Sequence, residues 1–192
     1  MTQLGFFIDQ TRCTGCYTCY VACKDWYDLS AGLDGFLKIK KIEKGTFPNL
    51  FLAYLPMMCN HCHDPPCIKA CPVEALTKRE KDGIVIVDSE KCLGNEKCDT
   101  KCLKVCPYDA PQFGLENGAK MNKCNLCVER LDQDKEPICV EACPMYAIKI
   151  GDVKELKEKF ECKSRTEGFV YHENYKPSIC FKPKESTLQE NK

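Results

Sequence analysis

The sequence predicts a loop-rich α+β fold in which short hairpins and short helices surround bound inorganic centres. Four dense groups take sixteen of the eighteen cysteines found in 192 residues. Large apolar side chains are diluted in consequence, so a core built from them alone would be thin. Features of the groups recur along the chain, which indicates internal duplication. Bound centres would complete the core, because the free energy of binding a metal contributes to folding.

The charge balance and the apolar pattern exclude several classes of protein. Lysine plus arginine and aspartate plus glutamate both total 28, so the basic surplus needed to bind nucleic acid is missing. No apolar run approaches the roughly 18 residues of a membrane span. Residues 1–13 lack the pattern of a signal peptide. We therefore expect a cytoplasmic protein whose thiols stay free for metal.

Short strands and helices are expected between the cysteine groups. Residues 6–9 and 147–150 predict two strands that can pair with each other. Residues 75–78 and 84–88 predict a hairpin, because the turn signal Asp82-Gly83 separates them. The last Cys-x-x-x-Cys of each group has the spacing of a first helical turn.

The remaining segments are less regular. Residues 24–58 are expected to be a long connector between the first two groups. Asp152 is expected to cap a helix with one apolar face, made of Val153, Leu156 and Phe160. The polar tail from Glu185 onward is expected to fray.

The four cysteine groups share a common pattern. They are CTGCYTCYVAC (13–23), CNHCHDPPCIKACP (59–72), CLGNEKCDTKCLKVCP (92–107) and CNLCVERLDQDKEPICVEACP (124–144). The last three close in C-P-x-x-A. In the first and third groups an aspartate, Asp9 or Asp88, stands four residues ahead of the first cysteine. The simplest interpretation is duplication of one cysteine-binding unit.

This spacing is typical of iron–sulfur clusters. A cubane cluster has four iron corners, and each takes one thiolate. A tight loop supplies three thiolates and points backbone N–H groups at the anionic cluster. In two-cluster ferredoxins the fourth cysteine of each run ligates the other cluster. We therefore expect Cys13, Cys16 and Cys19 to bind one cluster and Cys23 to reach a second.

Zinc binding, a disulfide scaffold and a redox dithiol each fit the pattern less well. Zinc uses two Cys-x-x-Cys pairs set apart, not four cysteines in one short run. A disulfide scaffold suits small secreted chains. A thioredoxin-like dithiol explains at most one pair.

These motifs resemble a known family. CTGCYTCYVACKDWYDL, CNHCHDPPCIKACPVEAL, DGIVIVD, CPYDAP, KCNLCVERL and PICVEACP resemble the four-cluster iron–sulfur subunits of the dimethyl-sulfoxide-reductase family of molybdopterin oxidoreductases, over about residues 5–150. The resemblance implies two bacterial 2[4Fe-4S] ferredoxin-like modules. Module 1 takes residues 1–58 and 108–150, and module 2, residues 59–107, is inserted within it. Residues 151–192 would form a C-terminal helix and tail that pack on the modules or a partner.

The resemblance also implies which cysteines share a cluster. Cluster 1 takes Cys13, Cys16, Cys19 and Cys143; cluster 2 takes Cys124, Cys127, Cys139 and Cys23; cluster 3 takes Cys59, Cys62, Cys67 and Cys106; cluster 4 takes Cys92, Cys98, Cys102 and Cys71. By analogy the clusters form a row in that order, with cluster 1 nearest the catalytic subunit.

Group three departs from the family pattern C-x2-C-x2-C-x3-C-P. Asn95 stands where the second cysteine belongs, and Leu-Lys-Val separates Cys102 from Cys106. Because the number of cysteines is preserved, we expect a rearranged loop that still holds a [4Fe-4S] cluster. The alternatives are a [3Fe-4S] cluster or none.

A few other residues have a structural and a functional interpretation. His61 is expected to be a donor behind the cluster ligands or simply exposed, rather than a ligand. Cys162 and Cys180 are expected to be ordinary buried thiols. Trp26 and Tyr27 are expected to pack in the core or at an interface.

The expected function is electron transfer without catalysis. The sequence has no nucleophile–base pair, no phosphate loop and no open metal site. The resemblance implies a larger molybdopterin- or tungstopterin-containing catalytic partner, with a membrane anchor or a soluble carrier as the external partner. Export with a signal-bearing partner would place the chain in the periplasm. The alternative is a free polyferredoxin, and a stoichiometric large subunit after purification would exclude it.

Overall fold

The computed structural model describes residues 2–32 and 35–186, and it mixes short helices with short strands, as an α+β fold requires. The elements in chain order are β1 (Leu4–Asp9), α1 (Thr18–Trp26), β2 (Leu37–Thr46), β3 (Asn49–Met58), α2 (Pro66–Ala70), β4 (Leu76–Lys78), β5 (Val85–Val87), α3 (Asn95–Cys98), α4 (Lys101–Lys104), β6 (Gln112–Phe113), β7 (Met121–Asn122), α5 (Val128–Leu131), α6 (Ile138–Glu141), β8 (Ile148–Asp152), α7 (Val153–Phe160) and β9 (Ile179–Lys182). Within these residues, no helix combines the length and apolar character needed to cross a membrane.

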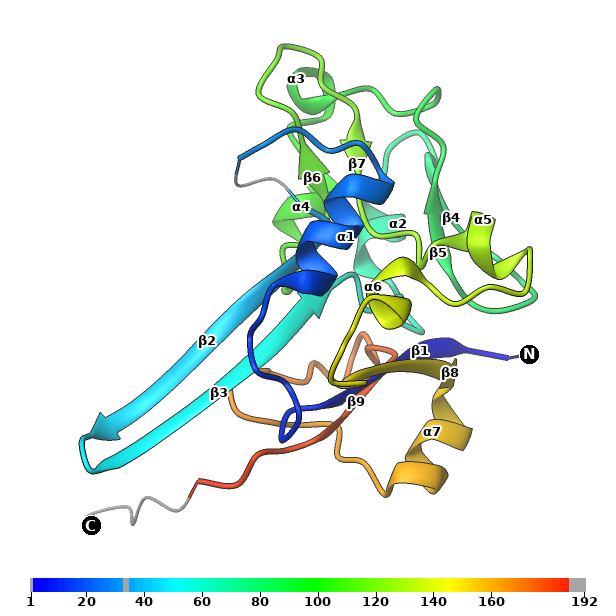
Figure 1. Ribbon diagram of the computed structural model, residues 1–192. Coiled ribbons are helices and arrows are strands. Elements are labelled where there is room, and N and C mark those ends of the chain that lie inside the picture. Colours follow the sequence, from blue (N-terminus) through cyan, green and yellow to red (C-terminus); the bar gives the residue numbers. More distant parts are fainter. Residues whose placement is uncertain (1, 33–34, 187–192) are drawn as a thin grey trace.

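A three-stranded sheet, β8-β1-β9, joins the two ends of the chain (Figure 1). β1 pairs antiparallel with β8, with Ile8 opposite Ile148, which confirms the predicted pairing. β9 pairs parallel with β1 on its other side, with Phe6 opposite Ile179. These four side chains are buried, so the sheet builds apolar core beneath the cysteine-rich loops.

The predicted hairpin is also present. β4 pairs antiparallel with β5, with Leu76 opposite Val87. The turn between them contains Gly83 at φ 72°, a left-handed conformation that favours glycine. The carboxylate of Asp82 accepts a hydrogen bond from the Ile84 N–H at 3.1 Å, which closes the turn.

The expected connector at residues 24–58 is instead largely a hairpin, so that prediction is wrong. β2 and β3 pair along ten positions and extend away from the rest of the molecule in Figure 1. Phe51, Ala53 and Leu55 alternate along β3 and are buried. This two-residue period of burial is typical of a strand with one buried face, but residues 50–58 are all apolar in the sequence, so the period cannot be read from the sequence of β3.

Helix α7 forms as predicted. The Asp152 carboxylate caps it by accepting hydrogen bonds from the Lys154 and Glu155 N–H groups. On its inner face Leu156 is buried and Phe160 stacks on Phe7, with ring centroids 4.2 Å apart. Of the predicted polar tail, residues 187–192 lie outside the described residues.

Cys162 and Cys180 are bonded to each other, so the prediction of two ordinary thiols is wrong. Their Cα atoms lie 5.6 Å apart, although 18 positions separate them in the sequence. β9 brings Cys180 beside Phe7, and the Lys163 and Phe181 backbones exchange two hydrogen bonds. The bond therefore ties the end of α7 to the central sheet, and only the sixteen clustered cysteines remain free.

Replacing both bonded cysteines by alanine is expected to lower the free energy of unfolding by about 3 kcal/mol, because the bond joins residues 18 positions apart and so restricts the unfolded chain. Guanidinium unfolding of the parent protein and the double variant measures the loss. As a control, dithiothreitol should lower the midpoint of the parent but leave that of the variant unchanged. Equal midpoints for both proteins would show that the bond adds no stability.

Candidate iron–sulfur sites

The first set of cysteines surrounds a hollow beside the β2–β3 hairpin. Cys13, Cys16, Cys19 and Cys143 line it, and its empty volume is about 320 Å³. The loop turns at Gly15, where φ is 68°, and α1 then carries Cys19 in its first turn. Burial, and after it the neighbouring thiolates, that of Cys143 first, raise the pKa of Cys19 to about 12. A thiol from group four therefore meets three from group one.

The second set lies deeper, where α1 packs against α6. It combines Cys23 from α1 with Cys124, Cys127 and Cys139 from group four. Burial raises the pKa of Cys139 well above its usual value, and the thiolates of the other three cysteines add to the effect. Cys23 thus leaves its own group and joins group four, the reciprocal of the exchange in the first set.

The third set combines three thiols of group two with one of group three. Cys59, Cys62, Cys67 and Cys106 line a hollow of about 380 Å³. The pKa of Cys62 is raised to about 12. Burial is the largest cause, and the thiolates of Cys59, Cys67 and Cys106 contribute after it.

The fourth set completes the exchange. Cys71, Cys92, Cys98 and Cys102 line a hollow of about 330 Å³. Burial raises the pKa of Cys102 to about 11, and the thiolates of Cys98, Cys92 and Cys71 contribute. Three of these thiols come from group three and one from group two.

The departure in group three has a structural role. Asn95 donates a hydrogen bond to the Glu116 carbonyl at 3.0 Å and accepts one from the Gly118 N–H at 2.9 Å. Asn95 therefore anchors the loop at 114–118, and α3 delivers Cys98 to the hollow instead. The rearranged loop still presents four thiols.

The repeated C-P-x-x-A motif forms a sulfur-binding turn. The alanine N–H donates to the cysteine sulfur four residues earlier, at 3.3 Å from Ala75 to Cys71 and from Ala147 to Cys143. The Ala110 N–H lowers the pKa of Cys106 against the larger rise caused by burial. In all three copies the residue before alanine has a left-handed φ: 52° at Glu74, 49° at Asp109 and 51° at Tyr146. Such donors stabilise negative charge on sulfur.

Neighbouring sets lie close enough for thiolates of one to raise the pKa of thiols in the next. Burial is the largest cause in each case, and a thiolate of the adjacent set adds to it. The pairs are Cys19 with Cys139, Cys59 with Cys124, and Cys67 with Cys102. The four sets therefore adjoin one another in the order first, second, third, fourth.

The thiols are spaced for clusters rather than for single ions. In the part of the chain that the structure describes, no three histidine, cysteine, aspartate or glutamate side chains lie close enough to hold one metal ion. A tetrahedral zinc ion with bonds of about 2.3 Å would require such closeness. Four thiols around a hollow, with backbone donors aimed at the sulfurs, fit an iron–sulfur cluster.

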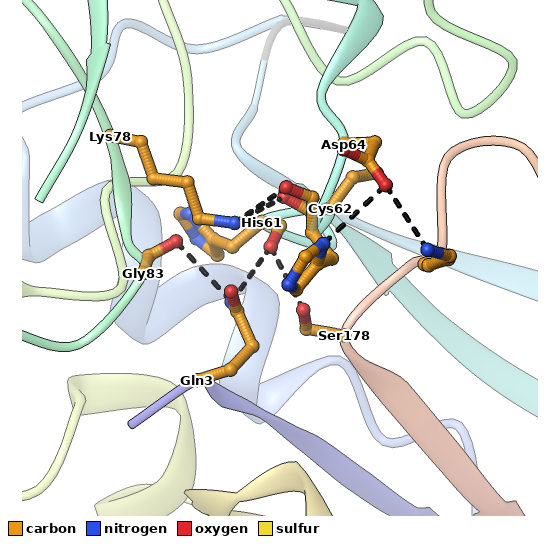
Figure 2. A network of polar contacts seen from close by, with 9 residues as sticks. Gln3, His61, Cys62, Asp64, Lys78, Gly83 and Ser178 are labelled. Carbon is orange, nitrogen blue, oxygen red and sulfur yellow. Dashed lines mark hydrogen bonds and ion pairs between the residues drawn. The ribbon is translucent and has the colours of Figure 1, made fainter. Parts of the chain in front are cut away.

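His61 is buried, so of the two expected alternatives, a donor behind the cluster ligands or an exposed side chain, the second is wrong. Its Nδ1 accepts a hydrogen bond from the Val85 N–H at 3.1 Å. Its carbonyl accepts from Gln3 at 3.0 Å and from Ser178 at 2.9 Å (Figure 2). Burial lowers the pKa of the ring well below its usual value, and two nearby lysines lower it further. His61 therefore holds the loop between Cys59 and Cys62 in place.

Tyr27 packs against the main core as predicted, whereas Trp26 is 44% exposed; both residues join α1 to the segment of group four. The indole N–H of Trp26 donates to the Glu129 carboxylate at 2.9 Å, and the guanidinium of Arg130 lies 4.7 Å from the indole ring. The Tyr27 hydroxyl donates to the Asn125 side chain at 2.5 Å. These contacts hold two segments of the second set together.

Two polar residues at the third hollow were not predicted from the sequence. Asn60 and Lys123 line this hollow, and each is only 2% exposed. Each stands directly beside a clustered cysteine, Cys59 or Cys124, in the sequence. That adjacency is the signal from which they could have been found.

Comparison with known proteins agrees with this geometry. Residues 50–153 match the model of a 4Fe-4S dicluster domain. The chain is 42% identical over 190 residues to a chain of the anaerobic dimethyl sulfoxide reductase of Escherichia coli K12, covering 95% of this protein and 89% of that one. It is 35% identical to a subunit of the sulfite dehydrogenase of Allochromatium vinosum, covering 88% and 76% of the two proteins. It is also 30% identical to the arsenate respiratory reductase iron-sulfur subunit of Shewanella sp. ANA-3, covering 82% and 85%.

The cysteine sets and the matched domain define a ferredoxin-like iron–sulfur protein whose task is electron transfer. The chain belongs to the family of iron–sulfur subunits of dimethyl-sulfoxide-reductase-type molybdopterin oxidoreductases, and it is the non-catalytic, electron-transferring subunit.

Proposed function

We propose that the chain holds four [4Fe-4S] clusters, one in each cysteine set, and conducts electrons along the row. Each cluster, when bound, takes up and releases one electron. The support is the exchange of one thiol between paired groups, which brings four thiols to each of three hollows. The chain's own contribution is to hold the sets side by side and to shield them from water.

The same geometry favours a complete [4Fe-4S] cluster in the fourth set over a [3Fe-4S] cluster. A [3Fe-4S] cluster lacks one iron corner and takes only three thiolates, so it would leave one of the four cysteines without iron. Cys98, supplied by α3, stands at the hollow together with Cys71, Cys92 and Cys102, so all four corners have a ligand.

Two apolar cores support the proposal of two modules. One core includes Phe6, Leu55 and Ile148, which come from both ends of the expected module 1. The other includes Leu76 and Val85 of the expected insertion. Met121 belongs to this second core, so we propose that the inserted module extends beyond residue 107.

A large catalytic partner is proposed for the first set. The relatives are named as components of reductases and of a dehydrogenase, and we infer a partner with a molybdopterin or tungstopterin cofactor. Cys16 is exposed, and three apolar residues close in sequence to thiols of the first set, Tyr17, Val21 and Tyr146, are 47%, 60% and 64% exposed. Exposed apolar residues of this kind are typical of an interaction surface. At the fourth set we propose a membrane anchor or a soluble carrier as the external partner.

The disulfide supports a proposal about the compartment. Disulfides persist in oxidising compartments and are rare in the cytosol. The bond between Cys162 and Cys180 therefore favours a mature protein outside the cytoplasm, exported together with a partner that carries the signal.

Anaerobic affinity purification from native cells tests the proposed function. We expect a stoichiometric large subunit to co-purify and to become reduced when electrons are supplied to the tagged chain. A cluster-loaded chain that always purifies alone, yet exchanges electrons with several enzymes, would establish the free polyferredoxin instead.

A further inference from the structure

The hollow of the third set contains a buried cation. Lys123 is 2% exposed and its ammonium donates to two carbonyls, those of Val85 and Cys124. An ammonium has three donors, so one remains. Across residues 2–32 and 35–186, Lys123 has no carboxylate partner. A buried cation needs a counter-charge, and the atoms lining the hollow around it include four thiols.

The same hollow contains an amide without a protein partner. Asn60 is 2% exposed, and neither its Nδ2 nor its Oδ1 makes a hydrogen bond within the described structure. Buried polar atoms without partners are rare in folded proteins. The loop itself is firmly held, because the carbonyl of Asn60 accepts from Ser178 at 2.9 Å and that of His61 from Gln3 at 3.0 Å (Figure 2). A mobile loop therefore does not explain the unpaired amide.

The other two hollows lack this arrangement. No charged side chain lines the first hollow. The fourth has Lys101, which is exposed and therefore screened by water. A charge acts more strongly when it is buried, since the surrounding dielectric constant is lower.

Resting on the cluster assignment proposed above, we infer that Lys123 and Asn60 raise the reduction potential of the cluster held by Cys59, Cys62, Cys67 and Cys106. Reduction adds one electron, and hence one negative charge, to this hollow. The buried ammonium and the Asn60 amide, which has no protein partner within the described structure, are the polar groups at this hollow that can stabilise that charge. Net charge and hydrogen bonds to the sulfurs are established determinants of cluster potential. An electron that moves along the row is therefore stabilised at the third cluster, which lies between the second and fourth sets.

Lys123 also contacts the second set, so its charge is expected to act on two clusters. Its ammonium donates to the carbonyl of Cys124, a thiol residue of the second set, at 2.9 Å, and Lys123 also lines the third hollow together with Cys67. Of the three hollows described above, Asn60 lines only that of the third set. Replacing Lys123 is therefore expected to move two potentials, whereas replacing Asn60 moves one.

The test is an anaerobic reductive titration followed by electron paramagnetic resonance, on the complete chain. We expect Lys123→Met and the isosteric Asn60→Asp to reduce the ratio of reduced to oxidised third cluster at least tenfold at a fixed potential, which is about 59 mV for a one-electron couple. Lys123→Arg, which keeps the charge, should restore the ratio to within about threefold of the parent. Lys101→Met is the matched control and should change it less than threefold.

Iron content separates this inference from the proposed function. Variants that retain the parent's iron and sulfide but show unchanged midpoints would overturn the inference and leave the cluster assignment intact. If Lys123→Met loses iron, the isosteric Asn60→Asp decides on its own. A parent protein without iron would overturn both.

Discussion

Iron removal is expected to abolish the cooperative unfolding of this protein. Seven of the clustered cysteines belong to the two main apolar cores, among them Cys19, Cys139 and Cys67. Without bound clusters, the hollows lined by the thiols remain unfilled, and the four thiols of each set have no cluster to hold them together. Binding energy that stabilised the fold is then absent. Thermal melts followed by near-ultraviolet circular dichroism, before and after chelation under anaerobic conditions, measure the loss.

The disulfide provides the control for that experiment. It does not depend on iron, so the sheet β8-β1-β9 and α7 should keep more secondary structure than the remainder after chelation. Reducing the disulfide in the iron-free protein should remove the secondary structure that remains. An iron-free protein that melts as sharply and at the same temperature as the loaded one would contradict the account.

Replacing Cys143 by alanine is expected to expose the thiols of group one, not those of group four. Cys143 stands with Cys13, Cys16 and Cys19 at the first hollow, so its loss should destabilise that cluster and release about four iron atoms. Anaerobic alkylation followed by peptide mass spectrometry should then label those three thiols.

The reciprocal variant is the matched control. Cys23→Ala should leave group one protected and expose Cys124, Cys127 and Cys139, whose pKa values and packing place them with Cys23. Labelling confined to the group that carries the mutation would mean that each group binds its own cluster. The crosswise assignment would then be wrong.

Local sequence signals predicted several elements correctly, because neighbouring residues determine them. The hairpin of β4 and β5 follows from an Asp-Gly turn between β-branched residues. The cap at Asp152 depends on residues two and three positions later. The two aspartates ahead of groups one and three act alike, since the carbonyls of Asp9 and Asp88 each accept from the N–H of the following cysteine at 3.2 Å.

Features that depend on distant segments were missed. The pairing of Cys162 with Cys180 requires β9 to lie parallel to β1, and nothing local to either cysteine indicates this. The burial of Lys123 depends on the carbonyl of Val85, 38 positions away. The β2–β3 hairpin was missed for a different reason: the sequence alternates only at residues 37–40 and is continuously apolar at residues 50–58, and the lysines and glycines of this segment resembled a connector.

The central claim is that sixteen thiols hold four clusters in a row. The most direct test is the iron and acid-labile sulfide content of anaerobically purified protein, together with its Mössbauer spectrum. We expect about sixteen iron and sixteen sulfide per chain, all in [4Fe-4S] form, whereas about fifteen iron would indicate a three-iron centre in the fourth set. A correctly folded protein that contains no iron would contradict the account.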